Sequence, residues 1–139
     1  MTKKIILPGI IAAVIMGAVG IGIGVLFSAI FPRLNDEYAN TAMFRAMDDP
    51  LMILFWFAPL ITGIVLAYFW SISKEMIKGK NMWSRGAKFG LAFWLVTTIP
   101  GMFITYSSFQ VSALITFTWL LNGLTNGLIS GWVFAKMNK

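Results

Sequence analysis

The sequence contains no cysteine and no histidine. Without cysteine the chain forms no disulfide and no thiolate metal site, and without histidine it lacks the commonest general base and metal ligand. Charged residues make up only 12% of the chain, against about a quarter in soluble domains, while 58% of its residues are hydrophobic. This composition excludes an ordinary soluble domain and predicts an integral membrane protein.

Four long apolar runs, none with a formally charged side chain, account for this composition. Each reaches the length of about 18–20 residues that a helix needs to cross a bilayer. The runs cover residues 5–31, 51–73, 89–109 and 111–135. The first is too long for the apolar core of a secretory signal, which has about 7–15 residues. We therefore expect a single transmembrane domain over residues 1–139, an all-α antiparallel bundle of four transmembrane helices.

The basic residues indicate how this bundle is oriented. Nine of the eleven lysines and arginines lie before the first run, between the second and third, or after the fourth. The positive-inside rule then places both termini and residues 74–88 in the cytoplasm, as in a multi-pass protein of the cell's inner (cytoplasmic) membrane. The net charge of +6 therefore reflects topology and attraction to anionic lipid. Nucleic acid is not an expected partner, because residues 74–88 contain no recognisable binding motif.

The longest segment between the runs, residues 32–50, is expected on the outer side. Pro32 ends the first helix because proline cannot continue the hydrogen-bond ladder, and Asp49 before Pro50 is typical of a helix N-cap. Within residues 37–47 the apolar side chains have the spacing of a short amphipathic helix lying on the membrane surface. The functional interpretation of this segment is a lid or a docking surface, and the favoured interpretation is a plain connector with one or two ordered turns.

Small residues recur at helical spacing in three of the runs or at their edges. Glycines four residues apart let another helix backbone approach closely within a bilayer. The candidate packing residues are Ala13, Gly17, Gly20, Gly24 and Ser28, then Gly86 and Gly90, and finally Gly123, Gly127 and Gly131. We expect the first and fourth helices each to present a glycine face to a close neighbour. That neighbour is a helix of the same chain, of a second copy, or of another membrane protein.

Polar residues and prolines are predicted to share one depth in the membrane. Counting about 1.5 Å per residue from each outer helix end puts Gly20, Thr62, Thr98 and Asn122 near mid-membrane. Two prolines close to this layer are expected to kink their helices and free backbone carbonyls. The kink residues are Pro59 and Pro100, and the candidate polar residues are Thr62, Thr97, Thr98, Asn122, Asn126 and Ser130. These residues form either interhelical hydrogen bonds or a small polar cavity for a neutral, zwitterionic or weakly held ionic solute.

The sequence gives little support to catalysis. The apolar runs contain no side chain for acid–base chemistry, and the acidic residue that small four-helix drug exporters need in their first helix is absent from residues 5–31. The acidic pairs Asp36-Glu37 and Asp48-Asp49 are more typical of helix caps than of a metal site, so no metal or cofactor is predicted. We expect a non-catalytic membrane protein that packs helices in a homo-oligomer or larger membrane complex. A small channel or carrier is the alternative, and a lipid-binding protein is a weaker one.

Overall fold

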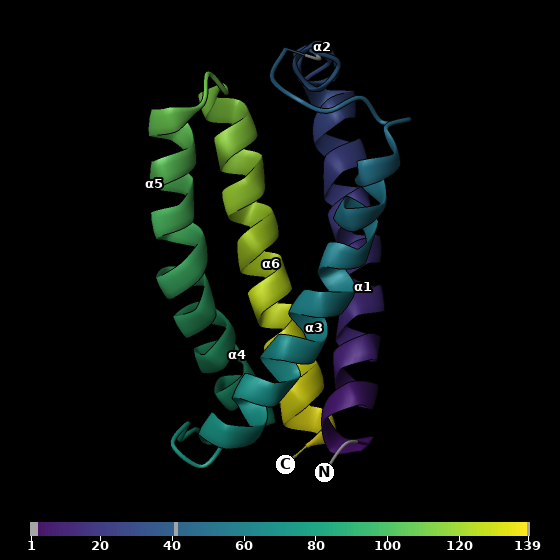
Figure 1. Cartoon of the computed structure of the whole chain (residues 1–139). Helices are drawn as coiled ribbons and strands as arrows, with labels where there is room; N and C mark the ends of the chain where they lie inside the picture. Colours follow the sequence, from purple (N-terminus) through teal and green to yellow (C-terminus); the bar gives the residue numbers. More distant parts are fainter. Residues whose placement is uncertain (1–2, 41, 139) are drawn as a thin grey trace.

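The computed structural model describes residues 3–40 and 42–138, which form helices and turns without a strand. The helices are α1 (Lys3–Ile30), α2 (Arg33–Tyr38), η1 (Pro50–Met52), α3 (Ile53–Ser73), α4 (Met82–Phe93), η2 (Trp94–Thr98), α5 (Ile99–Ser108) and α6 (Ala113–Met137). The long helices run up and down beside one another (Figure 1). Both chain ends lie at one end of the molecule, the terminal end, and α2 lies at the other, the α2 end.

Three of these helical stretches are long and apolar enough to cross a membrane, so the chain has the character of a membrane protein. They are Lys3–Ile30, Pro50–Ser73 and Met82–Ser108. The fourth predicted span forms α6, which has 25 residues but is less apolar because of its asparagines and threonines. Helix α6 packs against α1, α3, α4 and α5. The helix of lower hydropathy, α6, is therefore the one that the other helices surround most.

The third long helix begins earlier than predicted, at Met82 rather than near residue 89. Asn81 has an extended backbone, and its side-chain oxygen accepts a hydrogen bond from the Ser84 N–H at 2.9 Å. This N-cap starts the helix while the sequence is still charged. Arg85 and Lys88 lie in the first turns of this helix, before the apolar run begins at residue 89, and both side chains donate to backbone carbonyls of the segment that precedes the helix.

The predicted amphipathic helix over residues 37–47 is wrong. The helical turn in this segment is α2, and the described residues from Ala39 to Asp49 form turns, with position 41 outside the described residues. The side chain of Asn40 accepts a hydrogen bond from the Ala42 N–H at 3.1 Å, a local bond that competes with helix formation. The expected Asp49 cap before Pro50 is confirmed by a 2.8 Å bond from the Leu51 N–H.

The terminal end contains the largest hydrophobic cluster. Trp70 is fully buried and meets the Phe89 ring edge-on at 5.3 Å, and Phe89 lies 6.1 Å from Phe134. The Trp70 indole nitrogen donates to the backbone oxygen of Asn138 at 2.8 Å. The Asn138 amide nitrogen donates to the Lys4 oxygen at 3.3 Å. These contacts join α1, α3, α4 and α6 into one closed end.

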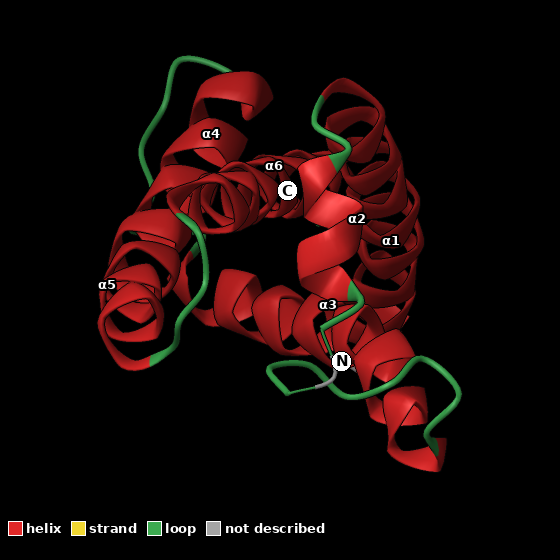
Figure 2. Ribbon diagram, turned by 90° about the horizontal axis from the view of Figure 1, so that it is seen from above, coloured by secondary structure: helices red, strands yellow, loops and turns green. Residues whose placement is uncertain are grey.

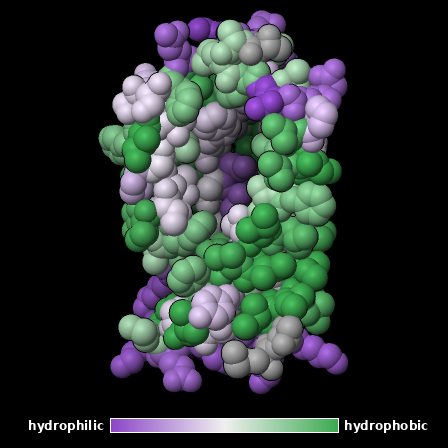
Figure 3. Space-filling view, viewed as in Figure 1, coloured by the Kyte–Doolittle hydropathy of each residue, from purple (hydrophilic) through white to green (hydrophobic). Residues whose placement is uncertain are grey.

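The α2 end is open by comparison. Neither η2 nor α5 contains a buried residue, and α3 has none before Gly63. Viewed from the side and from above, α5 lies on the opposite side of the molecule from α1 (Figures 1 and 2). The space-filling view shows a hollow between these two sides, nearer the α2 end (Figure 3). A second, apolar gap of about 180 Å³ separates α5 from the first turns of α6.

Candidate functional site

Four of the predicted packing glycines lie between α4 and α6. A Cβ added to Gly86 would lie 2.7 Å from the Gly131 oxygen, and one added to Gly127 would lie 2.6 Å from the Gly90 oxygen. Distances this short leave no room for a side chain between the two backbones. The glycine face of α6 therefore packs on α4 of the same chain, and it does not meet the small-residue face of α1.

The small residues of α1 divide into covered and uncovered positions. Ala13 is buried and contacts Gly63 of α3, and Gly20 faces the side chain of Asn122. An added Cβ would meet nothing within 4 Å at Gly17 or Gly24, so the described residues leave open space at these two positions. Ser28 is partly buried on the same helix.

A second glycine pair, not predicted from the sequence, joins α1 to α3. A Cβ added to Gly9 would lie 2.8 Å from the Ile64 Cα, and one added to Gly63 would overlap the Gly9 oxygen. Gly9 lies four residues before Ala13 and so continues the small-residue spacing of α1 by one more step. The same four-residue spacing could therefore have indicated this contact, although the predicted packing residues begin at Ala13.

Asn122 and Asn126 occupy successive turns of α6 and form the most unusual part of the site. The side-chain oxygens of both residues are buried and accept no hydrogen bond from the described part of the chain. The Asn122 oxygen lies 3.2 Å from the position of a Cβ on Gly20. A buried polar atom without a partner costs about 1–3 kcal/mol, and native structures contain few of them. Two on one helix face therefore require an explanation.

The backbone around Pro100 forms a π-helical turn, η2. The Ile99 N–H bonds to the Trp94 oxygen, and Pro100, which has no N–H to donate, follows as the second residue of α5 in the same continuous helical stretch. A π-turn absorbs the irregularity that the sequence predicted as a kink. The Trp94 indole donates to the Leu120 oxygen at 2.9 Å, which fixes this turn against α6.

The two threonines of η2 have different roles. The Thr98 side chain lies against Gly123, where an added Cβ would come within 2.5 Å of its methyl group. The Thr97 hydroxyl is exposed and donates to the Phe93 oxygen of its own helix at 2.8 Å. Thr98 therefore lies close to the asparagines, whereas Thr97 supplies no group to a shared layer.

The predicted mid-membrane layer is only partly assembled. Gly63, next to Thr62, packs on Gly9 and Ala13, whereas Gly20 faces Asn122 further along α1. Thr62 therefore lies nearer the terminal end than the depth count placed it. The count assumes that every helix starts at the same depth, but the packing of Gly63 on Gly9 and Ala13 places α3 nearer the terminal end than that assumption does. Pro59 lies within α3, in the part of that helix without buried residues.

Ser130 is also separate from the polar layer. Its hydroxyl is fully buried and is directed at the Asn126 and Gly127 oxygens at 2.8 and 3.0 Å. Both contacts lie within α6. The hydroxyl is therefore satisfied by its own helix and does not extend a polar path toward the terminal end.

At the α2 end, α2 packs on the first turns of α6. Leu34 is buried against Val111 and Ile115, and the Trp119 indole donates to the Tyr38 hydroxyl at 3.0 Å. Burial raises the pKa of Tyr38 despite this hydrogen bond, which lowers it. The small helix α2 thus covers the end of α6 without closing the hollow.

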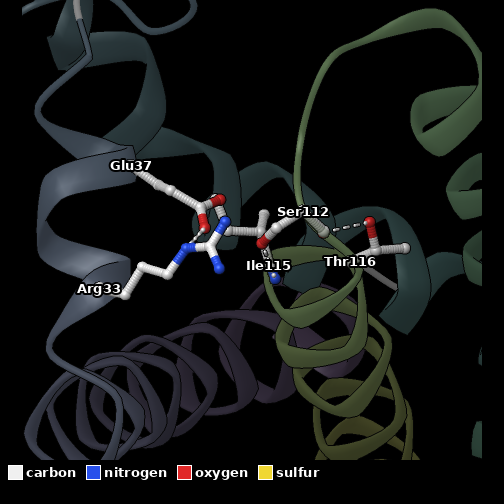
Figure 4. Close-up of polar contacts among 5 residues, drawn as sticks. All are labelled: Arg33, Glu37, Ser112, Ile115 and Thr116. Carbon is white, nitrogen blue, oxygen red and sulfur yellow. Dashed lines mark hydrogen bonds and ion pairs between the residues drawn. The ribbon is translucent and has the colours of Figure 1, made fainter.

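A charged pair on α2 lies beside the N-terminus of α6 (Figure 4). The Glu37 carboxylate is 3.4 Å from the Arg33 Nε, and Ser112 caps α6 by accepting from the Ile115 N–H at 3.2 Å. A carboxylate near a helix N-terminus is stabilised by the helix dipole.

A second ion pair lies in the turns before η1. The hydrogen bond that Arg45 donates to Asp49 at 2.7 Å lowers the pKa of Asp49.

Arg85 and Asn138 organise the terminal end, although the sequence analysis gave neither a role. Arg85 donates to the Ile77 and Lys74 oxygens at 3.1 and 2.7 Å, and its guanidinium carbon lies 5.6 Å from the Trp70 ring centre. The Lys74 ammonium donates to the Asn138 side chain at 3.1 Å. An arginine in a basic loop and an asparagine near the end of the sequence carry no local pattern that predicts these contacts.

No group of three metal-ligating side chains occurs within residues 3–40 and 42–138. Comparison with known proteins finds no matching family model, no matching curated protein and no matching solved structure.

Proposed function

We propose that the chain is a multi-pass protein of the cell's cytoplasmic membrane, crossed four times, with both termini in the cytoplasm. The crossings are α1, α3, the continuous stretch α4–η2–α5, and α6. Large apolar side chains are exposed along these helices, as contact with lipid requires. Exposed lysines gather at the terminal end, as the positive-inside rule expects of a cytoplasmic surface: they are Lys3, Lys4, Lys78, Lys80, Lys88 and Lys136.

This orientation predicts which side of the membrane single cysteines face. Met47 and Met76 are 67% and 81% exposed at opposite ends of the molecule, and the chain has no native cysteine to interfere. In intact cells, Met47→Cys should react with a membrane-impermeant maleimide. Met76→Cys should react only after the membrane is permeabilised. The reverse pattern, or equal labelling of both before permeabilisation, would contradict the proposed orientation.

We further propose that the protein is a non-catalytic subunit that assembles through Gly17 and Gly24, the positions on the small-residue face of α1 where the described residues leave open space. The observation that carries this proposal is the open space at Gly17 and Gly24. Close backbone approach at small residues is a main source of helix association in membranes. The simplest partner is α1 of a second copy, because one surface can then meet itself across a two-fold axis.

Disulfide cross-linking in native membranes tests this assembly. Gly17→Cys and Gly24→Cys lie on the proposed face, so both should form dimers under mild oxidation. Gly22→Cys is a matched control, because it is also a glycine with open space around it and lies on a different face of α1 at nearly the same depth. Monomers only at positions 17 and 24, or equally efficient dimers at position 22, would rule out this interface.

A further inference from the structure

The hollow at the α2 end has a hydrophilic surface at its depth (Figure 3). It opens between the α1–α3 side and the α5–α6 side, where η2, α5 and the first part of α3 contribute no buried residue. At the terminal end the same helices are closed by Trp70, Phe89 and Phe134. The hollow is therefore closed toward the terminal end and open on the side seen in Figure 3, nearer the α2 end, from which a solute would enter it.

The two asparagines provide hydrogen-bonding capacity that the chain leaves unused. The side-chain oxygens of Asn122 and Asn126 have no donor within the described residues, although each residue as a whole is only partly buried. The terminal torsion of asparagine is broad. Because both oxygens are buried in the structure, binding requires a rotation about this torsion that would bring each oxygen toward a molecule in the hollow. The same amides also supply N–H donors.

The absence of charge defines the kind of molecule that fits. Residues 5–31, 51–73, 89–109 and 111–135 contain no charged side chain, so an ion would lose its hydration without a counter-charge. A neutral molecule with N–H or O–H groups loses less hydration free energy than an ion does, and it gains hydrogen bonds to the amide oxygens. We infer that the hollow binds a small neutral solute with at least two hydrogen-bond donors, such as a primary amide or a polyol, at Asn122 and Asn126.

Saturation-transfer NMR on the protein in nanodiscs tests this inference, with acetamide and glycerol as separate probes. The wild type should transfer saturation to at least one probe. Asn122→Leu combined with Asn126→Leu should reduce that transfer at least tenfold, because leucine has nearly the same size but no amide. Asn122→Ala combined with Asn126→Ala should reduce it equally, which separates loss of the amides from filling of the hollow. Asn40→Leu, in the exposed turn, should leave it unchanged.

Thermal unfolding of the same samples shows whether each variant is folded, so that a loss of binding can be distinguished from a loss of structure. The double leucine variant should unfold at a higher temperature than the wild type, because it removes two buried oxygens without partners. No transfer from the folded wild type, or equal transfer from the wild type and both double variants, would overturn the inference. The side of the membrane from which the solute enters follows from the proposed orientation of the chain, whereas binding of the solute does not depend on assembly through α1. Binding in nanodiscs and cross-linking through α1 can therefore fail independently.

Discussion

Replacing Gly90 with alanine is expected to force α4 away from α6 and to destabilise the folded protein strongly. A Cβ at this position would overlap the Gly127 oxygen and lie 2.5 Å from its carbonyl carbon. Both atoms belong to the backbone and cannot move aside as a flexible side chain can. Overpacking of this kind costs about 1–3 kcal/mol and occasionally more. We expect a destabilisation at the upper end of this range. It should appear as a decrease in the midpoint of thermal unfolding, followed by tryptophan fluorescence in nanodiscs.

Gly22→Ala and Gly101→Ala are the matched controls. A Cβ at either position would meet nothing within 4 Å, and alanine favours a helix over glycine by up to about 1 kcal/mol. Both variants should therefore be as stable as the wild type or slightly more stable. If Gly90→Ala behaves like these controls, the contact between α4 and α6 is not part of the folded protein.

Replacing Trp70 with alanine should open the terminal end. The substitution removes a fully buried ring, its contact with Phe89 and its hydrogen bond to the Asn138 oxygen. Large-to-alanine substitutions of buried aromatic residues cost about 3–5 kcal/mol. We expect a large drop in the unfolding midpoint and, since Asn138 also bonds to Lys4, faster proteolysis at both chain ends.

Two further variants separate packing from hydrogen bonding at this position. Trp70→Phe keeps an apolar ring but leaves the Asn138 oxygen without its donor, so its cost should be smaller, about 1–3 kcal/mol. Trp56→Ala removes a side chain that is 54% exposed and should change stability little. Equal effects of Trp70→Ala and Trp56→Ala would show that Trp70 does not hold the terminal end together.

The helices could be predicted from the sequence because apolar run length depends on local composition alone. Their ends were predicted less well, since a cap acts through one side chain and not through average hydropathy. Asn81 starts α4 within a charged stretch, and Asn40 favours a turn where the apolar spacing indicated a helix. In both places a single polar side chain outweighs the pattern around it.

The candidate site shows the same division between local and tertiary information. Glycine spacing pointed to residues that can approach another backbone, but it did not tell which helices meet. Gly127 packs on Gly90, whereas a Cβ added to Gly24 would meet nothing within 4 Å among the described residues. The depth count brought Thr62 to the level of Asn122 because it assumed equal helix heights. The position of one helix relative to another along the bundle axis depends on the connecting turns and on contacts such as that of Gly9 with Gly63. The length of an apolar run contains no information about either.

The decisive measurement for a bundle that is closed at its terminal end and open to Asn122 from the α2 side is the accessibility of a single cysteine at position 122 in sealed membrane vesicles of known orientation. In such a bundle, Asn122→Cys reacts with a small membrane-impermeant thiol reagent from the outer, α2 side only. Ser130→Cys, at a position that is fully buried, should stay unreactive from both sides. Protection of position 122 from both sides, or reaction from the cytoplasmic side, would contradict a membrane protein closed at its terminal end and open to Asn122 from the other.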